Sequence, residues 1–274
     1  MSKDNYVAYA AKSFTLPDIC VRLRTVWDDP RSDASEIGKL ISLDPSLTAK
    51  VLKLANSSLF RFPSQITSIA KAISVVGGEA LYNLVVAETA NTAFSHFDSA
   101  LIDIEKHWYA SVYTGMVAKY LAKTLNIRGS ERFFVMGILQ NLSELVVAKV
   151  APERYSEYRS AECSGLPYDQ QKAFFGFTFS QCSGTILERW NIPLALHHPI
   201  TFVSDAKKQT GKSDIAILAM AMRIAIAQDD EEHKKEIELF PSELANTLDI
   251  DFDTINNAVE YANRETSKVA MLIR

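Results

Sequence analysis

Cysteine, glycine and proline are scarce in this chain of 274 residues. The three cysteines, Cys20, Cys163 and Cys182, stand far apart and form no Cys-x-x-Cys pair, which argues against a disulfide framework or a zinc knuckle. We expect buried structural thiols in a reducing compartment. Ten glycines and nine prolines are few for a turn-rich β protein, so the composition favours long helices.

Long apolar runs and a strong net charge are also lacking. The first 14 residues have no secretory apolar core, and the run from Ile215 to Met222 ends at Arg223, too short to span a bilayer. A net charge of -4 offers no field that would attract nucleic acid. We therefore expect a cytoplasmic protein with neither nucleic acid nor a membrane as a partner.

The most regular pattern lies between Leu43 and Gly77 and predicts two helices joined by a tight connection. Asp44 suits the N-cap and Pro45 the first helical position. The side chains predicted to share the buried face of the first helix are Leu47, Val51, Leu54 and Ala55. The second helix is expected after Pro63, ending at Gly77-Gly78, with Ile66, Ile69, Ala70, Ile73 and Val76 buried.

The rest of the chain also has helical periodicity. A helical segment is expected near 130–150, apolar on nearly every side and continuous up to Pro152. Further helices are expected at about 17–28, 34–42, 79–94, 105–125, 152–163, 167–175, 180–190, 193–203, 214–228, 241–248 and 252–271.

Two stretches, LDPSLTAKVLKLANSS and ITSIAKAISVVGGEAL, closely resemble the signature of the HDOD family, the HD-related output domain. The resemblance runs from about Phe14 to Val203. It implies a helical bacterial signalling module related to the metal-dependent HD phosphohydrolases. We expect an all-α fold with two packed helical subdomains, 1–100 with an N-terminal arm and 101–205 as an HD-like bundle. A helical extension, 206–274, is expected to pack on the bundle.

The resemblance also identifies the positions where the HD metal ligands would stand. The family's Gly-Leu-Leu-His-Asp-Ile-Gly helix is matched by residues 137–143, which places Gln140 and Asn141 at the paired His and Asp. Ala110 stands at the His of a Trp-x-His-Ser pattern, and Phe179 at a further family His. Amides, a methyl group and a ring are poor ligands and cannot act as general bases. We expect a relic site without metal, cofactor or catalysis.

A metal site elsewhere stays open as the alternative. His197 and His198 are adjacent, with Glu188 and Asp205 nearby in sequence, but neighbouring helical residues point about 100° apart, which makes joint chelation awkward. His96, His107 and His233 are isolated in the sequence. The alternative function is therefore a phosphohydrolase of the HD superfamily with an altered metal site.

The connection between the two helices predicted within Leu43–Gly77 is a candidate interaction surface. Phe60, Arg61 and Phe62 combine two rings with a cation, which is typical of interface anchors. Asn56 and Ser57 are matched polar positions, for which capping of the helix is the simpler role. The sequence predicts a non-catalytic signalling module that binds a protein or a small ligand, with self-association open.

Overall fold

The computed structural model describes residues 1–161, 166–229 and 242–273. Within these ranges the chain forms helices and no strand, which confirms the all-α prediction. Two of the predicted buried thiols, Cys20 and Cys182, are buried and free. Cys163, His233 and the predicted helix start at Pro241 lie outside the described residues.

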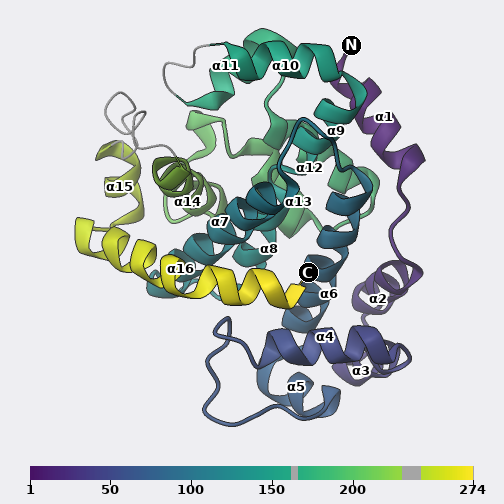
Figure 1. Cartoon of the computed structure of the whole chain (residues 1–274). Coiled ribbons are helices and arrows are strands. Elements are labelled where there is room, and N and C mark those ends of the chain that lie inside the picture. Colours follow the sequence, from purple (N-terminus) through teal and green to yellow (C-terminus); the bar gives the residue numbers. More distant parts are fainter. Residues whose placement is uncertain (162–165, 230–241, 274) are drawn as a thin grey trace.

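Four short helices form the lower part of the molecule in Figure 1. They are α2 (Asp18–Asp28), α3 (Ala34–Ser42), α4 (Pro45–Ala55) and α5 (Ile69–Val76). As predicted, Asp44 caps α4, because its Oδ1 accepts the backbone N–H groups of Ser46 and Leu47 at 2.9 and 3.0 Å. The four side chains expected on the buried face of α4 are all buried.

The second helix of this pair departs from the prediction. It starts at Ile69, capped by Ser68, rather than after Pro63. Ile66 is buried in the connection before it, where Asn56 Oδ1 accepts its N–H at 2.7 Å and Asn56 Nδ2 donates to its carbonyl at 2.8 Å. Ala70 is exposed, contrary to expectation. Two hydrogen bonds between the Asn56 side chain and the Ile66 backbone therefore stand where periodicity predicted the first helical turn.

α6 (Gly78–His96) runs from this lower group into the upper group of helices (Figure 1). It meets α5 at 115° around Gly77, whose φ of 90° is a conformation that favours glycine. Most of its side chains are buried, including the polar Asn83, Glu88 and Thr89. α6 therefore belongs to the core of both groups.

The upper group is built around α7 (Ile104–Thr124) and α8 (Glu131–Leu139). They cross closely, because a Cβ added at Gly137 would lie 2.3 Å from the Cα of Gly115. A larger side chain at either position would separate the two helices. Around them lie α9 (Leu142–Val150), α10 (Pro152–Ser160), α11 (Pro167–Phe175), α12 (Phe179–Arg189) and α13 (Leu194–Phe202).

The prediction of one continuous helix up to Pro152 is wrong, because the helix breaks at Gln140 and Asn141. Ser143 turns its backbone N–H to Ser183 Oγ on α12, at 2.9 Å, instead of to the carbonyl four residues back. Its own hydroxyl donates to the Phe179 carbonyl at 2.6 Å. These tertiary hydrogen bonds compensate for the open turn, and they place the break at the relic positions.

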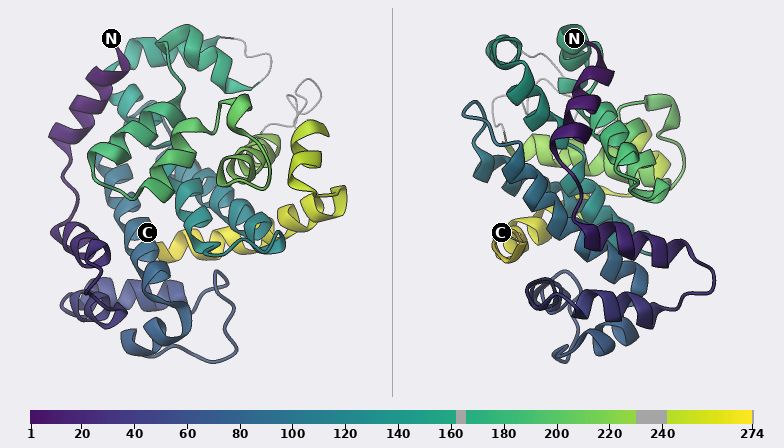
Figure 2. Two further views of the ribbon diagram at one scale, coloured as in Figure 1. Left: turned by 180° about the vertical axis from the view of Figure 1, so that it is seen from behind. Right: turned by 90° about the vertical axis from the view of Figure 1, so that its right-hand side faces the viewer.

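The helices at both ends of the chain pack on the upper group, and the C-terminal one also reaches the lower group. The segment expected as an N-terminal arm contains α1 (Lys3–Ser13), which packs on α9 and α12 beside the upper group (Figure 2). α14 (Asp214–Asp229) packs on α7, and α15 (Ser242–Leu248) packs on α14. α16 (Phe252–Ile273) lies along α7 and reaches α4, and Trp108 Nε1 donates to the Ala270 carbonyl at 3.2 Å. The limits predicted for the three domains stay predictions.

One segment of the described chain, 131–150, is long and apolar enough to cross a membrane. Of its most apolar window, 83% is buried inside the protein. α5 and α6 pass the same test only if their bent pair is counted as one span. A mostly buried core helix has this composition too, so neither segment is strong evidence for a membrane span.

Candidate functional site

The four relic positions come from three parts of the upper group. Ala110 is half-buried on α7, while Gln140 and Asn141 form the turn between α8 and α9. Phe179 begins α12, is 1% exposed, and packs its ring 5.5 Å from the ring of Tyr158. At the Phe179 position a buried aromatic cluster therefore stands where the resemblance places a metal ligand.

A buried polar cluster lies beside these positions, and it centres on Glu144 of α9. Tyr155 on α10 donates its hydroxyl to Glu144 Oε1 at 2.8 Å, and Asn141 Nδ2 donates to Glu144 Oε2. His107 Nδ1 on α7 lies 3.6 Å from the same Oε2. The side chains of His107 and Glu144 are 8% and 11% exposed, so the cluster is screened from solvent.

The surroundings of His107 favour its neutral form. Burial lowers the pKa of His107 and outweighs the Glu144 carboxylate and a hydrogen bond to the Asn141 backbone, which both raise it; Arg159 lowers it further. Burial, and then Glu144, raise the pKa of Tyr155, which keeps its hydroxyl protonated as a donor. His107 Nε2 is buried without a hydrogen-bond partner. The Glu144 side chain is therefore held by neutral donors beside an uncharged imidazole.

This cluster corrects the interpretation of His107 as isolated. His107 precedes Ala110 by three residues, and Glu144 follows Asn141 by three, so each is one helical turn from a matched position. That spacing is visible in the sequence. Their approach across two helices is not, because it depends on how α7 and α9 pack.

The residues at the relic site do not fit a metal ion. The described part of the chain contains no group of three or more His, Cys, Asp or Glu side chains that could hold one. At the matched positions the side chains are two amides, a methyl group and a ring, which offer no anionic ligand. Glu144, the nearby acid, already accepts two hydrogen bonds. These side chains therefore do not supply the set of ligands that a metal-dependent reaction needs.

The alternative pair, His197 and His198, lies on α13. His198 is exposed and its ring packs 4.8 Å from that of Phe202, whereas His197 is half-buried. Burial lowers the pKa of His197, with Glu188 opposing the shift. Among the described residues, neither this pair nor the acids near it belong to a group of three or more His, Cys, Asp or Glu side chains that could hold a metal ion.

The candidate interaction surface lies in the connection after α4. Asn56 and Ser57 are used within the fold: Asn56 binds Ile66, and Ser57 Oγ donates to the Leu54 carbonyl at 2.6 Å. Phe60 and Phe62 are half-buried and stack with ring centroids 5.8 Å apart. Arg61 is exposed and adopts a positive φ of 55°. Arg61 therefore offers an exposed cation to a partner.

The model of the HDOD domain family matches residues 14–206 of this chain. An uncharacterized protein of Treponema pallidum (strain Nichols) is 26% identical over 190 residues, which cover 68% of this chain. Those residues are 36% of that protein, so the chain spans about a third of the length of this curated relative.

Two solved structures share the fold. A candidate phosphohydrolase from Shewanella amazonensis has a TM-score of 0.70 at 20% identity, covering 98% of each chain. An HDOD domain protein of unknown function from Geobacter sulfurreducens also has a TM-score of 0.70, at 18% identity, covering 98% of this chain and 97% of that one. At such identities the likeness shows the fold alone.

Proposed function

The chain belongs to the HDOD family, and from that premise we propose that it is a non-catalytic regulatory module of bacterial signal transduction. It acts by binding a signalling protein or a small ligand, in the cytoplasm. The observation that carries the proposal is the chemistry of the four relic positions. Ala110, Gln140, Asn141 and Phe179 supply neither a charged metal ligand nor a group that takes a proton from water.

The polar cluster supports the same proposal. An HD phosphohydrolase needs several ligands free to bind a divalent ion and its activated water. Here both carboxylate oxygens of Glu144 already accept hydrogen bonds, one from Tyr155 and one from Asn141. His107 has one free nitrogen, but that nitrogen is buried.

The alternative function, a phosphohydrolase with an altered metal site, has one observation in its favour. His107 and Glu144 are two ligand-type groups 3.6 Å apart beside the relic positions. Two ligands are fewer than the three protein ligands of typical catalytic zinc sites. We therefore rank this function second and test it directly.

The test measures metal content and hydrolysis together. After purification with added manganese or zinc, we expect less than one tenth of an equivalent of bound metal and no turnover of phosphodiesters or nucleotides. The variant Gln140→His with Asn141→Asp should stay inactive, because a hydrolytic site needs several ligands at once. Wild-type turnover that Gln140→Ala, Asn141→Ala or Glu144→Gln abolishes would overturn the proposal.

A further inference from the structure

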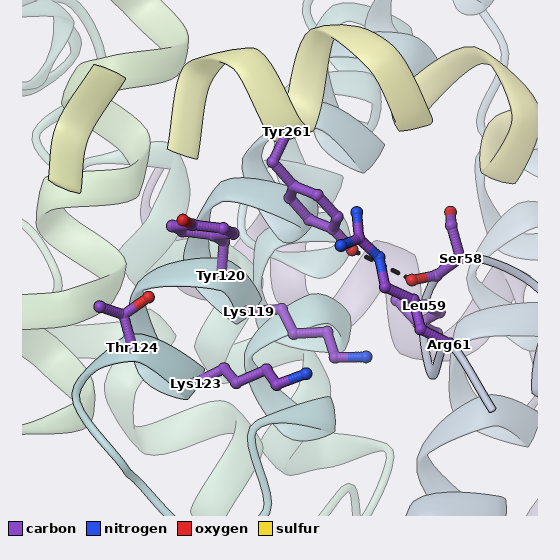
Figure 3. A pocket seen from close by; sticks show the side chains of 8 residues that line it. All are labelled: Ser58, Leu59, Arg61, Lys119, Tyr120, Lys123, Thr124 and Tyr261. Atoms are coloured by element: carbon purple, nitrogen blue, oxygen red, sulfur yellow. Dashed lines mark hydrogen bonds between the residues drawn. The ribbon is translucent and has the colours of Figure 1, made fainter. Parts of the chain in front are cut away.

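A second site lies at the other end of α7. A cavity of about 310 Å³ opens between the 56–68 connection, the last turns of α7, and α16 (Figure 3). Lys119 and Lys123 extend into it from successive turns of α7, and Arg61 and Tyr261 face them from the other two segments. At 1.5 Å per helical residue, Lys119 lies about 14 Å along α7 from Ala110, so the cavity is separate from the relic site.

The cavity carries positive charge only. Its lining includes Arg61, Lys119 and Lys123 and, in the part of the chain that the structure describes, no acidic side chain. Arg61 is partly compensated, because its guanidinium lies 3.8 Å from Glu265 and 4.6 Å from the ring centroid of Tyr261. Lys123 is exposed and so remains hydrated.

Lys119 is the unusual member of this set. It is 4% exposed, and its ammonium lies 4.6 Å from the ring centroid of Phe60. Among the described residues it makes no hydrogen bond or ion pair. Burial lowers the pKa of Lys119 to about 7; Glu131 opposes the shift, while Lys123 and Arg61 add to it. A buried ammonium that makes no ion pair is costly, and an anion in the cavity would lower that cost.

The shape and chemistry of the cavity limit the anion. Arg and Lys together suit phosphate, because the guanidinium presents a fork of N–H donors and each ammonium a point charge. Tyr120 and Tyr261 line the same space and offer apolar ring surface beside the cations. A volume of about 310 Å³ is at the small end of ligand pockets, which favours a small molecule over a protein segment.

We propose that this cavity binds a small phosphorylated ligand of about nucleotide size, with its phosphate held by Arg61, Lys119 and Lys123. The inference names the ligand class for the binding function proposed above and rests on it. It also gives Arg61 a specific role, as a cation that the 56–68 connection brings to two lysines of a distant helix.

The test is calorimetric titration of the whole chain at pH 6.5 with three probes: adenosine monophosphate, inorganic phosphate and adenosine. We expect the nucleotide to bind at least tenfold more tightly than phosphate, and adenosine to give no signal. Phosphate binding as tightly as the nucleotide would overturn the assigned ligand size. Adenosine binding as tightly as the nucleotide would overturn the role of the phosphate.

Variants assign the binding to this cavity. Lys119→Met keeps the length of the side chain and removes its charge, and it should weaken nucleotide binding at least tenfold. Arg61→Gln and Lys123→Gln should each weaken it several-fold. Lys53→Gln, an exposed lysine on α4 outside the cavity, is the matched control and should change binding less than twofold. A variant with both Lys119→Met and Lys123→Gln that is folded by circular dichroism and binds as the wild type does would overturn the inference.

The two proposals fail in different ways. A protein that neither binds the nucleotide nor hydrolyses phosphodiesters would overturn only this inference, since a protein partner could still engage the module. Metal-dependent hydrolysis lost in Asn141→Ala would overturn the proposed function. Binding of the nucleotide that Lys119→Met abolishes, without turnover, is the result expected from both.

Discussion

Tyr155 donates its hydroxyl to Glu144 across the gap between α10 and α9, with 2.8 Å between the two oxygens. This hydrogen bond satisfies one oxygen of a carboxylate whose side chain is 11% exposed. It also closes a link that runs from α10 through Glu144 to His107 on α7. Polar side chains from three helices therefore meet beside the four relic positions.

The first prediction concerns this link. Tyr155→Phe removes the donor and leaves a buried carboxylate oxygen without it, so the free energy of unfolding should fall by about 1–3 kcal/mol. Urea unfolding followed by circular dichroism measures the change. Tyr109→Phe, at a tyrosine that is 39% exposed on α7, is the control and should shift it by less than about 0.5 kcal/mol. Equal effects of the two variants would contradict a structural role for the cluster.

The second prediction concerns the core of the lower group. Leu54 is 0% exposed on α4, so Leu54→Ala should leave a cavity and lower the free energy of unfolding by about 2–5 kcal/mol. The matched control is Leu194→Ala, because Leu194 is 66% exposed at the start of α13. If urea unfolding of Leu54→Ala shifts by less than about 1 kcal/mol, this face of α4 contributes little to stability.

A third prediction follows from the burial of Lys119. Its pKa of about 7 in the folded chain lies below the value of about 10.4 expected for an unfolded lysine. Between these pH values the unfolded chain binds more protons, so the contribution of Lys119 to stability rises as the pH increases from about 7 to about 10. At pH 6.5, Lys119→Met should therefore be more stable than the wild type by at least about 1 kcal/mol.

That advantage should shrink toward pH 9.5, where Lys119 is neutral in the folded wild type. Thermal and urea unfolding at pH 6.5, 8 and 9.5 would measure it. Lys53→Met, at an exposed lysine, should show no such trend. A Lys119→Met variant that is less stable than the wild type at pH 6.5 would show that the ammonium has a stabilising partner.

The sequence predicts most of the helices of this chain, because helix signals are local. Asp44, Pro45 and the apolar face through Leu54 lie within one helix, and spacing alone places each of them correctly. The break before α9 depends on Ser183, 40 residues from Ser143, and no local pattern reports that contact. The late start of α5 depends in the same way on the hydrogen bonds of Asn56.

The candidate sites follow the same division. The resemblance assigns the relic positions from three separate motifs, each of which is a short stretch of sequence. The approach of His107 to Glu144 and of Arg61 to Lys119 cannot be identified in this way, since each pair joins helices or connections far apart in the chain. A lysine in the middle of an apolar helix, as in MVAKYLAKT, is the one local signal for the basic cavity.

The last prediction is the pH dependence of anion binding in that cavity. Sulfate is the suitable probe, because its charge does not change between pH 6 and 9. In the free protein the pKa of Lys119 is about 7, and a bound anion favours the ammonium form, so the pKa rises on binding. Binding therefore takes up a proton wherever Lys119 is neutral in the free protein. Below pH 6 the affinity should be constant; above pH 7 it should fall, approaching tenfold per pH unit. Lys119→Met should bind weakly with a flat profile, and Lys53→Gln should follow the wild type. An affinity for sulfate that is independent of pH in the wild type would mean that Lys119 does not contact the anion.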